Sequence, residues 1–221
     1  IVTGNATPNG DVVRGSVGND RIDMSDNDGV NGFVGLDYSL LSGPVAVTID
    51  GAANTGSIDK GAAGTDTLLG VEQPLAAGWT NGGLGITGTS GDDTFNLTPE
   101  GEQWMSVRGG DGVDSYTISG SGLVRMDFRD ATQGIDVNLA TRTIANDGFG
   151  NAETIGGTAP VHEIRGSGFD DTVRFSDFDD SYRYESGSNT IIGGTGFDHR
   201  PRRSDGHAGA SGARGSGCAM T

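Results

Sequence analysis

The sequence predicts an all-β chain, a parallel right-handed β-roll or β-helix-like solenoid whose turns are built from glycine and aspartate. Glycine accounts for 41 of the 221 residues and hydrophobic residues for 33%. Long helices are therefore disfavoured, since glycine is unfavourable inside them. A unit of Gly, any two residues, Gly, any, Asp, any, apolar recurs along the chain. Polar and apolar residues alternate after each such Asp, which is the pattern of a short half-buried strand.

The glycine–aspartate unit matches in full at four places and in part at three others. The full matches span residues 15–22, 61–68, 88–95 and 109–116 and hold Asp20, Asp66, Asp93 and Asp114. The partial matches span residues 32–38, 166–173 and 193–198 and hold Asp37, Asp171 and Asp198, while Asp11 lies nine residues before Asp20 as its tandem partner. We expect strands to begin near Ile22, Leu68, Phe95, Tyr116 and Val173. The repeat aspartates from Asp20 to Asp114 are 17 to 29 residues apart, which favours one glycine corner per coil of a solenoid.

The repeated unit resembles the calcium-binding nonapeptide of the repeats-in-toxin family, whose consensus is G-G-x-G-x-D-x-U-x. The resemblance covers about residues 4 to 198, with the units dispersed and not in unbroken tandem. It implies a secreted or cell-surface bacterial protein that folds on calcium binding outside the cell. Asp179 and Asp180 lie in a segment that resembles the one closing such repeat domains, although on its own the segment reads as a solvated acidic loop.

The glycines and aspartates of one unit suit a calcium site. Glycine allows strained turns whose carbonyls point at one spot, and the aspartate adds a carboxylate there. Calcium takes six to eight oxygen ligands, so carbonyls and carboxylates of two stacked turns can hold it. The alternative at each aspartate is a turn in which the carboxylate bonds its own backbone and no metal binds. The predicted metal-site residues are Gly18, Asp20, Asp11, Asp37, Gly64, Asp66, Gly91, Asp93, Gly112, Asp114, Asp171 and Asp198.

A longer repeat divides the chain into two related modules. Residues 38–50 and 128–139 each contain an aromatic residue, a polar turn with glycine and then strict apolar alternation, which indicates a half-buried strand. We expect one solenoid module over residues 1–100 and a second over residues 101–198. Residues 199–221 form a basic tail rich in glycine and arginine, without apolar periodicity, and we expect this tail to lie outside the fold.

Charge and composition restrict the partners. The net charge is −16, and residues 1–198 carry 29 of the 30 acidic residues. Repulsion therefore disfavours nucleic acid and anionic membranes, whereas divalent cations are favoured. No run of about 18 apolar residues could span a membrane. The lone Cys218 cannot form an internal disulfide, so stability must come from other interactions.

No catalytic motif is complete. His162 and Glu163 begin an H-E-x-x-H pattern, but position 166 is glycine, and neither a nucleophile elbow nor a phosphate-binding loop is present. We therefore expect a non-catalytic calcium-binding module of an exported protein, acting as a secretion or folding module, a spacer or an adhesin segment. The alternative is a polysaccharide-active domain on a parallel β-helix, a lyase, epimerase or hydrolase with Arg125, Arg129 or Arg142 in a groove. A polysaccharide or cell-surface glycan is the expected partner besides calcium.

Overall fold

The computed structural model describes residues 2–3, 11–25, 33–76 and 83–199. Over these residues the chain is almost entirely β. The helices in this part of the chain are a single turn of 3-10 helix, η1 (Gly61–Ala63), and one five-residue helix, α1 (Glu72–Ala76). The predicted all-β class is therefore confirmed. Most of the predicted tail, residues 200–221 with Cys218, lies outside the described residues.

The chain forms two compact units. The first unit comprises Ile1–Val124 with Gly156–Ala159, and the second comprises Arg125–Ile155 with Pro160–Thr221. The predicted division into residues 1–100 and 101–198 follows sequence similarity and remains a prediction.

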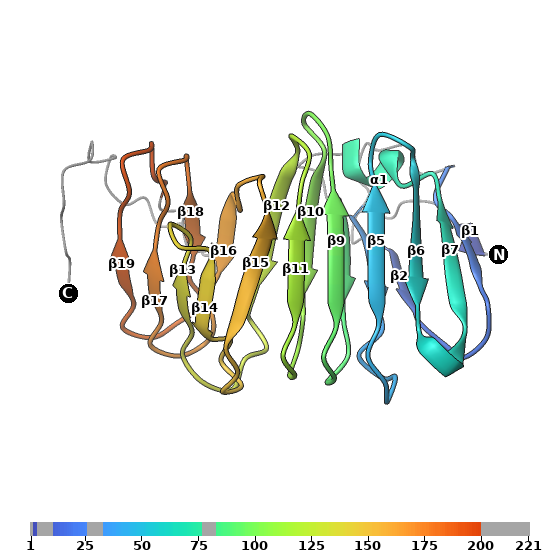
Figure 1. The fold of residues 1–221 in the computed structure, drawn as a ribbon, viewed down its shortest axis with the longest axis horizontal. Helices are drawn as coiled ribbons and strands as arrows, with labels where there is room; N and C mark the ends of the chain where they lie inside the picture. Colours follow the sequence, from blue (N-terminus) through green and yellow to red (C-terminus); the bar gives the residue numbers. More distant parts are fainter. Residues whose placement is uncertain (1, 4–10, 26–32, 77–82, 200–221) are drawn as a thin grey trace. The chain divides into compact units, whose positions relative to one another are not determined.

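The first unit has strands in two sheets (Figure 1). The first sheet contains, in spatial order, β1 (Val2–Thr3), β3 (Arg21–Asp23), β7 (Thr65–Leu69), β6 (Thr55–Asp59), β5 (Ala46–Asp50), β9 (Thr94–Thr98) and β11 (Ser115–Ile118). The second sheet contains β10 (Trp104–Arg108), β8 (Gly83–Thr87), β4 (Phe33–Asp37) and β2 (Asp11–Arg14). From β2 to β5 and from β8 to β11 the chain alternates between the two sheets, as the coils of a solenoid do.

The second unit repeats this alternation with shorter strands. One row of its strands contains β14 (Thr143–Asn146), β13 (Asp136–Asn138), β17 (Thr172–Arg174) and β19 (Thr190–Ile192), and another contains β18 (Ser181–Arg183) and β16 (Glu163–Arg165). β15 (Glu153–Gly157) and β12 (Leu123–Asp127) each contain residues of both units. Four of the five predicted strand starts lie one residue after the first residue of β3, β9, β11 or β17, whereas Leu68 lies near the end of β7, which begins at Thr65.

The pairing is mainly parallel, as predicted, but each unit also contains one antiparallel strand that the prediction lacked. β6 pairs antiparallel with β5 and β7, and β14 pairs antiparallel with β13 and β15. Both hairpins follow the longer sequence repeat, so that repeat corresponds to a repeated structure. The hairpin turns contain Asn54 and Arg142, whose φ angles of 59° and 56° are left-handed. Asparagine is among the residues that favour this region and arginine is not, so the sequence gives a signal for the first of these turns only.

The core consists of short inward-facing rows, which explains how a chain with so few hydrophobic residues can fold. Val47 of β5 pairs with Phe95 of β9, which pairs with Tyr116 of β11, and all three are at most 2% exposed. The rings of Phe95 and Tyr116 stack with centroids 5.3 Å apart. Each coil therefore contributes only a few apolar residues, because neighbouring coils bury one another.

Candidate metal centre at the glycine–aspartate corners

Each corner is a turn that places an aspartate at or just before the start of a strand. Before β9, the Thr89 N–H donates to Asp93 Oδ2 at 2.6 Å and Thr89 Oγ1 donates to Asp93 Oδ1 at 3.0 Å. Before β17, Ser167 donates the same two hydrogen bonds to Asp171, at 3.0 and 2.5 Å. Both aspartates are 1% exposed. These carboxylates therefore close their own turns, which is the alternative to metal binding that the sequence leaves open.

The two glycines of the repeat are needed for different structural reasons. A Cβ atom on Gly88 would overlap Asp93 Oδ2, because the carboxylate folds back against the first glycine of its own unit. Gly112, the second glycine of its unit, has φ of 104° and lies against the preceding coil, where a Cβ atom would be 2.6 Å from the Gly91 carbonyl oxygen. The first glycine thus makes room for the aspartate, and the second allows a left-handed turn that stacks closely.

Backbone N–H groups join each corner to the aspartate of the next coil. The Val45 N–H donates to Asp93 Oδ1 at 2.7 Å, and the Asp93 N–H donates to Asp114 Oδ1 at 2.9 Å. The second unit has the corresponding pairs Ile135–Asp171 and Asp171–Asn189, at 3.0 and 2.9 Å. We call this series the inner ladder. It supplies hydrogen-bond acceptors to buried amides that the sheets leave unpaired.

A second series runs along the residues that precede these positions. The pairs, with the N–H donor first and the Oδ1 acceptor second, are Thr65–Asn19, Val113–Asp92, Ser188–Asp170 and Phe197–Asp179. These distances are 2.7 or 2.8 Å. These four side chains therefore accept hydrogen bonds from the turn of the following coil.

Tyrosine hydroxyls complete three corners and were not anticipated from the sequence. The donor and acceptor pairs are Tyr38–Asp66, Tyr116–Asp114 and Tyr182–Asp171, with distances of 2.7, 3.3 and 2.5 Å to Oδ2. Burial raises the pKa of the Tyr38 and Tyr182 hydroxyls, and the bonded carboxylates raise it further. A signal existed for two of them, because Tyr116 and Tyr182 each lie two residues after a corner aspartate.

The predicted metal-site residues do not all lie in corners. Gly18, Gly64, Gly91 and Gly112 lie in turns that precede strands. Asp11 instead begins β2, and Asp37 ends β4, where its Oδ1 accepts from the Ser39 N–H at 3.0 Å. Among the described residues, no three His, Cys, Asp or Glu side chains form a group that could hold a metal ion. The hydrogen-bonded corners therefore account for most of the predicted aspartates without one.

The corner formed by Asp180 and Asp198 differs from the others. Asp180 Oδ2 accepts from the Ser176 N–H and Oγ at 2.5 and 2.7 Å, and Asp198 Oδ2 accepts from the Gly194 N–H at 3.0 Å. The Oδ1 atoms of both aspartates are buried and have no hydrogen-bond partner. The two residues are neighbours on successive coils, since the residues that follow them, Ser181 and His199, form a parallel bridge. This corner therefore offers two free, buried carboxylate oxygens.

The protonation equilibria reflect this difference. Burial raises the pKa of Asp180 to about 6, and the Asp198 and Asp179 carboxylates oppose its ionisation further, against the hydrogen bonds from Ser176. Burial, and to a smaller extent Asp179, also raise the pKa of Asp198, against the backbone amides of Gly194 and Asp180, which favour its ionised form. Two such carboxylates are stabilised either by a proton or by a bound cation.

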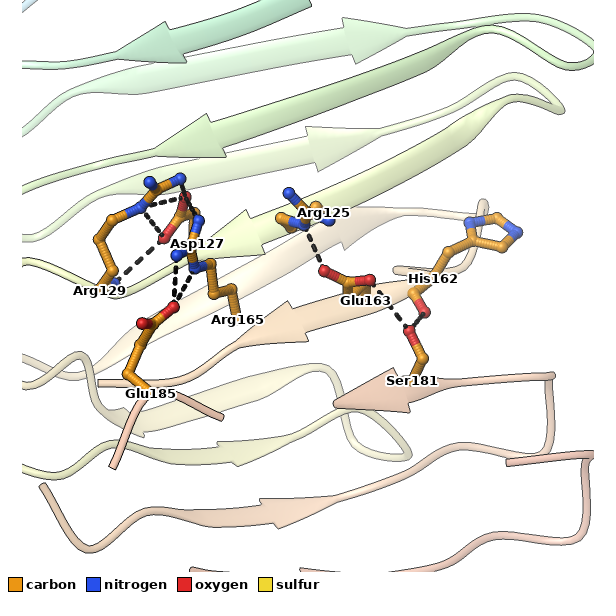
Figure 2. Close-up of polar contacts among 8 residues, drawn as sticks. All are labelled: Arg125, Asp127, Arg129, His162, Glu163, Arg165, Ser181 and Glu185. Carbon is orange, nitrogen blue, oxygen red and sulfur yellow. Dashed lines mark hydrogen bonds and ion pairs between the residues drawn. The ribbon is translucent and has the colours of Figure 1, made fainter. Parts of the chain in front are cut away.

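Paired charges lie on and beside the neighbouring strands β12 and β16 (Figure 2). Arg125 of β12 pairs with Glu163 of β16, and both side chains are nearly buried. Arg129 pairs with Asp127, while Arg165 pairs with Glu185. Arg125 and Arg129, proposed from the sequence for a polysaccharide groove, therefore share one face. Arg142 instead lies in the β13–β14 turn, where its Nε donates to the Ile155 carbonyl at 2.9 Å.

His162 directly precedes Glu163, and its backbone carbonyl bonds the neighbouring strand β18. Its carbonyl accepts from the Ser181 N–H at 2.9 Å and from Ser181 Oγ at 3.1 Å (Figure 2). The imidazole Nδ1 is buried without a hydrogen-bond partner. Burial lowers the pKa of His162, and Asp179 opposes that shift.

Comparison with protein-family models and with curated proteins finds no match for this chain. No helix among the described residues is long and apolar enough to cross a membrane.

Proposed function

We propose that the chain is a non-catalytic, calcium-stabilised solenoid module of an exported bacterial protein. The observation that carries the proposal is the pair of free, buried oxygens, Asp180 Oδ1 and Asp198 Oδ1, on adjacent coils. Every other feature of the corners is a hydrogen-bonded scaffold, which suits a spacer, an adhesin segment or a secretion and folding module better than a catalyst. The coils are proposed to be right-handed, as nearly all parallel crossover connections are.

Calcium fits the chemistry of this corner. It prefers oxygen ligands and accepts carboxylates, backbone carbonyls and water together. Asp180 and Asp198 would hold the ion, with water and turn carbonyls completing its shell. A divalent cation would also offset the burial, and the smaller repulsion, that raise the pKa of both groups. Because the chain carries a net charge of −16, calcium outside the cell would favour the folded state and low cytosolic calcium would not.

The test is a calcium titration of the full chain, with circular dichroism and the melting temperature Tm as readouts. A ligand that binds only the folded state at a hundredfold excess over Kd adds about 2.7 kcal/mol per site. We expect calcium to raise Tm and EGTA to reverse the rise. Asp180→Asn and Asp198→Asn should each remove the calcium response while leaving Tm in EGTA equal or higher, because each removes a repelling charge.

Asp136→Asn is the matched control. Asp136 lies in the same unit, but it pairs with Arg174 at 2.8 Å on the other sheet, and both side chains are exposed. This variant should retain the full calcium response. A wild-type Tm and β signal that are the same in calcium and in EGTA would refute the proposal.

A second candidate is a polysaccharide-active domain. The clustering of Arg125 and Arg129 with Arg165 on one face favours it, since arginines recognise carboxylated sugars. The test is release of unsaturated or reducing sugar ends from uronate polysaccharides. Activity that His162→Ala abolishes would replace the non-catalytic proposal, whereas absence of product from wild type would remove this candidate.

A further inference from the structure

Lys60 is the only lysine in the sequence, and its side chain is fully buried. It lies between β6 and η1, at the end of the antiparallel hairpin of the first unit. Burying an ammonium group is costly unless charges and hydrogen bonds compensate it. The buried ammonium of Lys60 must therefore be compensated by specific charged or hydrogen-bonding partners.

The partners of Lys60 are oxygens from two stacked corners. Its Nζ donates to Asp66 Oδ1 and, at 2.7 Å, to the Ser16 carbonyl oxygen. Asp20 Oδ2 lies 3.9 Å from the same nitrogen. The ammonium is thus surrounded by two carboxylates and a turn carbonyl, and this is the kind of oxygen set that calcium selects.

The remaining contacts hold the Asp66 carboxylate in place. The Asp20 N–H donates to Asp66 Oδ1 at 3.0 Å, and the Tyr38 hydroxyl donates to Asp66 Oδ2 at 2.7 Å. Asp66 is 1% exposed, whereas the Asp20 side chain is 48% exposed. The corner therefore has a fixed buried carboxylate on one side and an open side through which an ion could enter.

We infer that the Lys60 ammonium is a tethered cation that takes the place of a metal ion at the Asp20–Asp66 corner. This inference rests on the proposed function only in assigning calcium to the Asp180–Asp198 corner. The Asp180–Asp198 corner has two free carboxylate oxygens and no lysine, so it depends on an external cation. The Asp20–Asp66 corner of the first unit has the Lys60 ammonium and does not depend on an external cation.

The two hairpins show how this difference arises. In the first unit the hairpin strand β6 ends at Asp59, and Lys60 reaches back to the corner. In the second unit the matching strand β14 ends at Asn146 and Asp147 follows, whose Oδ1 accepts from the Phe149 N–H at 2.8 Å within its own turn. The cation is therefore supplied by one copy of the repeated hairpin only.

The decisive variant is Lys60→Met, which keeps the length of the apolar stem and removes the charge. We expect it to bind one calcium or terbium ion more per chain than wild type, counted by titration calorimetry. Terbium bound there should emit through excitation of Tyr38, and Tyr38→Phe in the Lys60→Met background should reduce that emission. Calcium should raise Tm of Lys60→Met by about 5 °C more than it raises Tm of wild type.

The matched control is the double variant Lys60→Met with Asp66→Asn, which should show no additional ion. If Lys60→Met does not fold in EGTA, we would measure whether it refolds in millimolar calcium. Failure to fold in both conditions would overturn the inference. A folded Lys60→Met that binds no more ions than wild type also overturns it. Failure of the proposed function is separate, because it would appear as a wild type that binds no calcium at all.

Discussion

The backbone N–H of Asp93 donates a hydrogen bond to the Asp114 carboxylate of the next coil, at 2.9 Å between N and Oδ1. Asp93 is at the same time an acceptor, from its own turn and from Val45. Each inner-ladder aspartate of this kind thus joins two coils and closes one turn. The repeated aspartate is therefore a structural requirement of the coil, whether or not a metal ion binds near it.

Replacing Asp93 with alanine should strongly destabilise the first unit. The N–H and Oγ1 of Thr89 and the N–H of Val45 would lose their acceptor in a buried site. Each unsatisfied buried donor costs roughly 1–3 kcal/mol, so we expect a loss of about 3 kcal/mol or more in urea unfolding. Asp92→Ala is the control, because the exposed Asp92 accepts a hydrogen bond from the Val113 N–H, and its loss should cost about 1 kcal/mol. Equal effects of the two variants would contradict the inner ladder.

The Arg125–Glu163 pair should show strong coupling in a double-mutant cycle. Glu163→Gln leaves the guanidinium of Arg125 buried with less compensating charge, and the loss of one partner of a buried pair typically costs about 3–5 kcal/mol. Arg125→Met with Glu163→Met should cost clearly less than the two single changes together. Chemical denaturation of the four proteins measures the coupling. Additive effects would mean that the pair does not join β12 to β16.

The corner tyrosines should resist ionisation at alkaline pH. The folded-state pKa values of Tyr38 and Tyr182 are raised above the unfolded value of about 10. Their contribution to stability is therefore fully present below about pH 10 and is lost as pH rises beyond it. Ultraviolet titration of phenolate should show both ionising only on unfolding. Tyr182→Phe should remove one such group and cost about 1–2 kcal/mol through the unsatisfied corner.

Stability in the absence of calcium should fall as pH rises from about 4 to 6. The pKa of Asp180 is raised from 3.8 to about 6 in the folded state, so its contribution is fully present below about pH 4 and lost as pH approaches 6. The raised pKa of Asp198 acts in the same direction. We expect Tm in buffer depleted of calcium to decrease over this window and Asp180→Asn to flatten the decrease. A Tm that rises through the window in wild type would contradict the assignment.

Spacing and alternation were sufficient to predict the parallel strands and the corners. The first glycine and the aspartate are five residues apart because the carboxylate folds back against the glycine, as at Gly88 and Asp93. Both residues of this contact lie in one turn, so the contact appears in the sequence as a fixed spacing. The partial match ending at Asp37 shows the limit. Gly35 fits the pattern, but it lies within β4 beneath the Phe33 ring, so a glycine needed for packing resembles one needed for a turn.

Contacts distant in sequence could not be predicted in the same way. Lys60 meets Ser16 and Asp20, which lie 44 and 40 residues earlier in the sequence, only because the hairpin returns it to that corner. The hairpins themselves were missed, since the left-handed position of each turn is occupied by a residue other than glycine, Asn54 or Arg142. Both features depend on how the coils stack, and residue spacing contains little information on that.

The inner ladder gives the chain a direction. In every pair the donor is a backbone N–H of an earlier residue and the acceptor is a side chain of a later one, from Val45 with Asp93 to Asp171 with Asn189. Deleting coils from the carboxyl end would remove the acceptors of inner-ladder amides. Deleting them from the amino end would instead remove the acceptors of the second series, in which the N–H donors are the later residues, from Thr65 to Phe197. A growing chain would thus complete the inner ladder of each coil only when the next coil arrives.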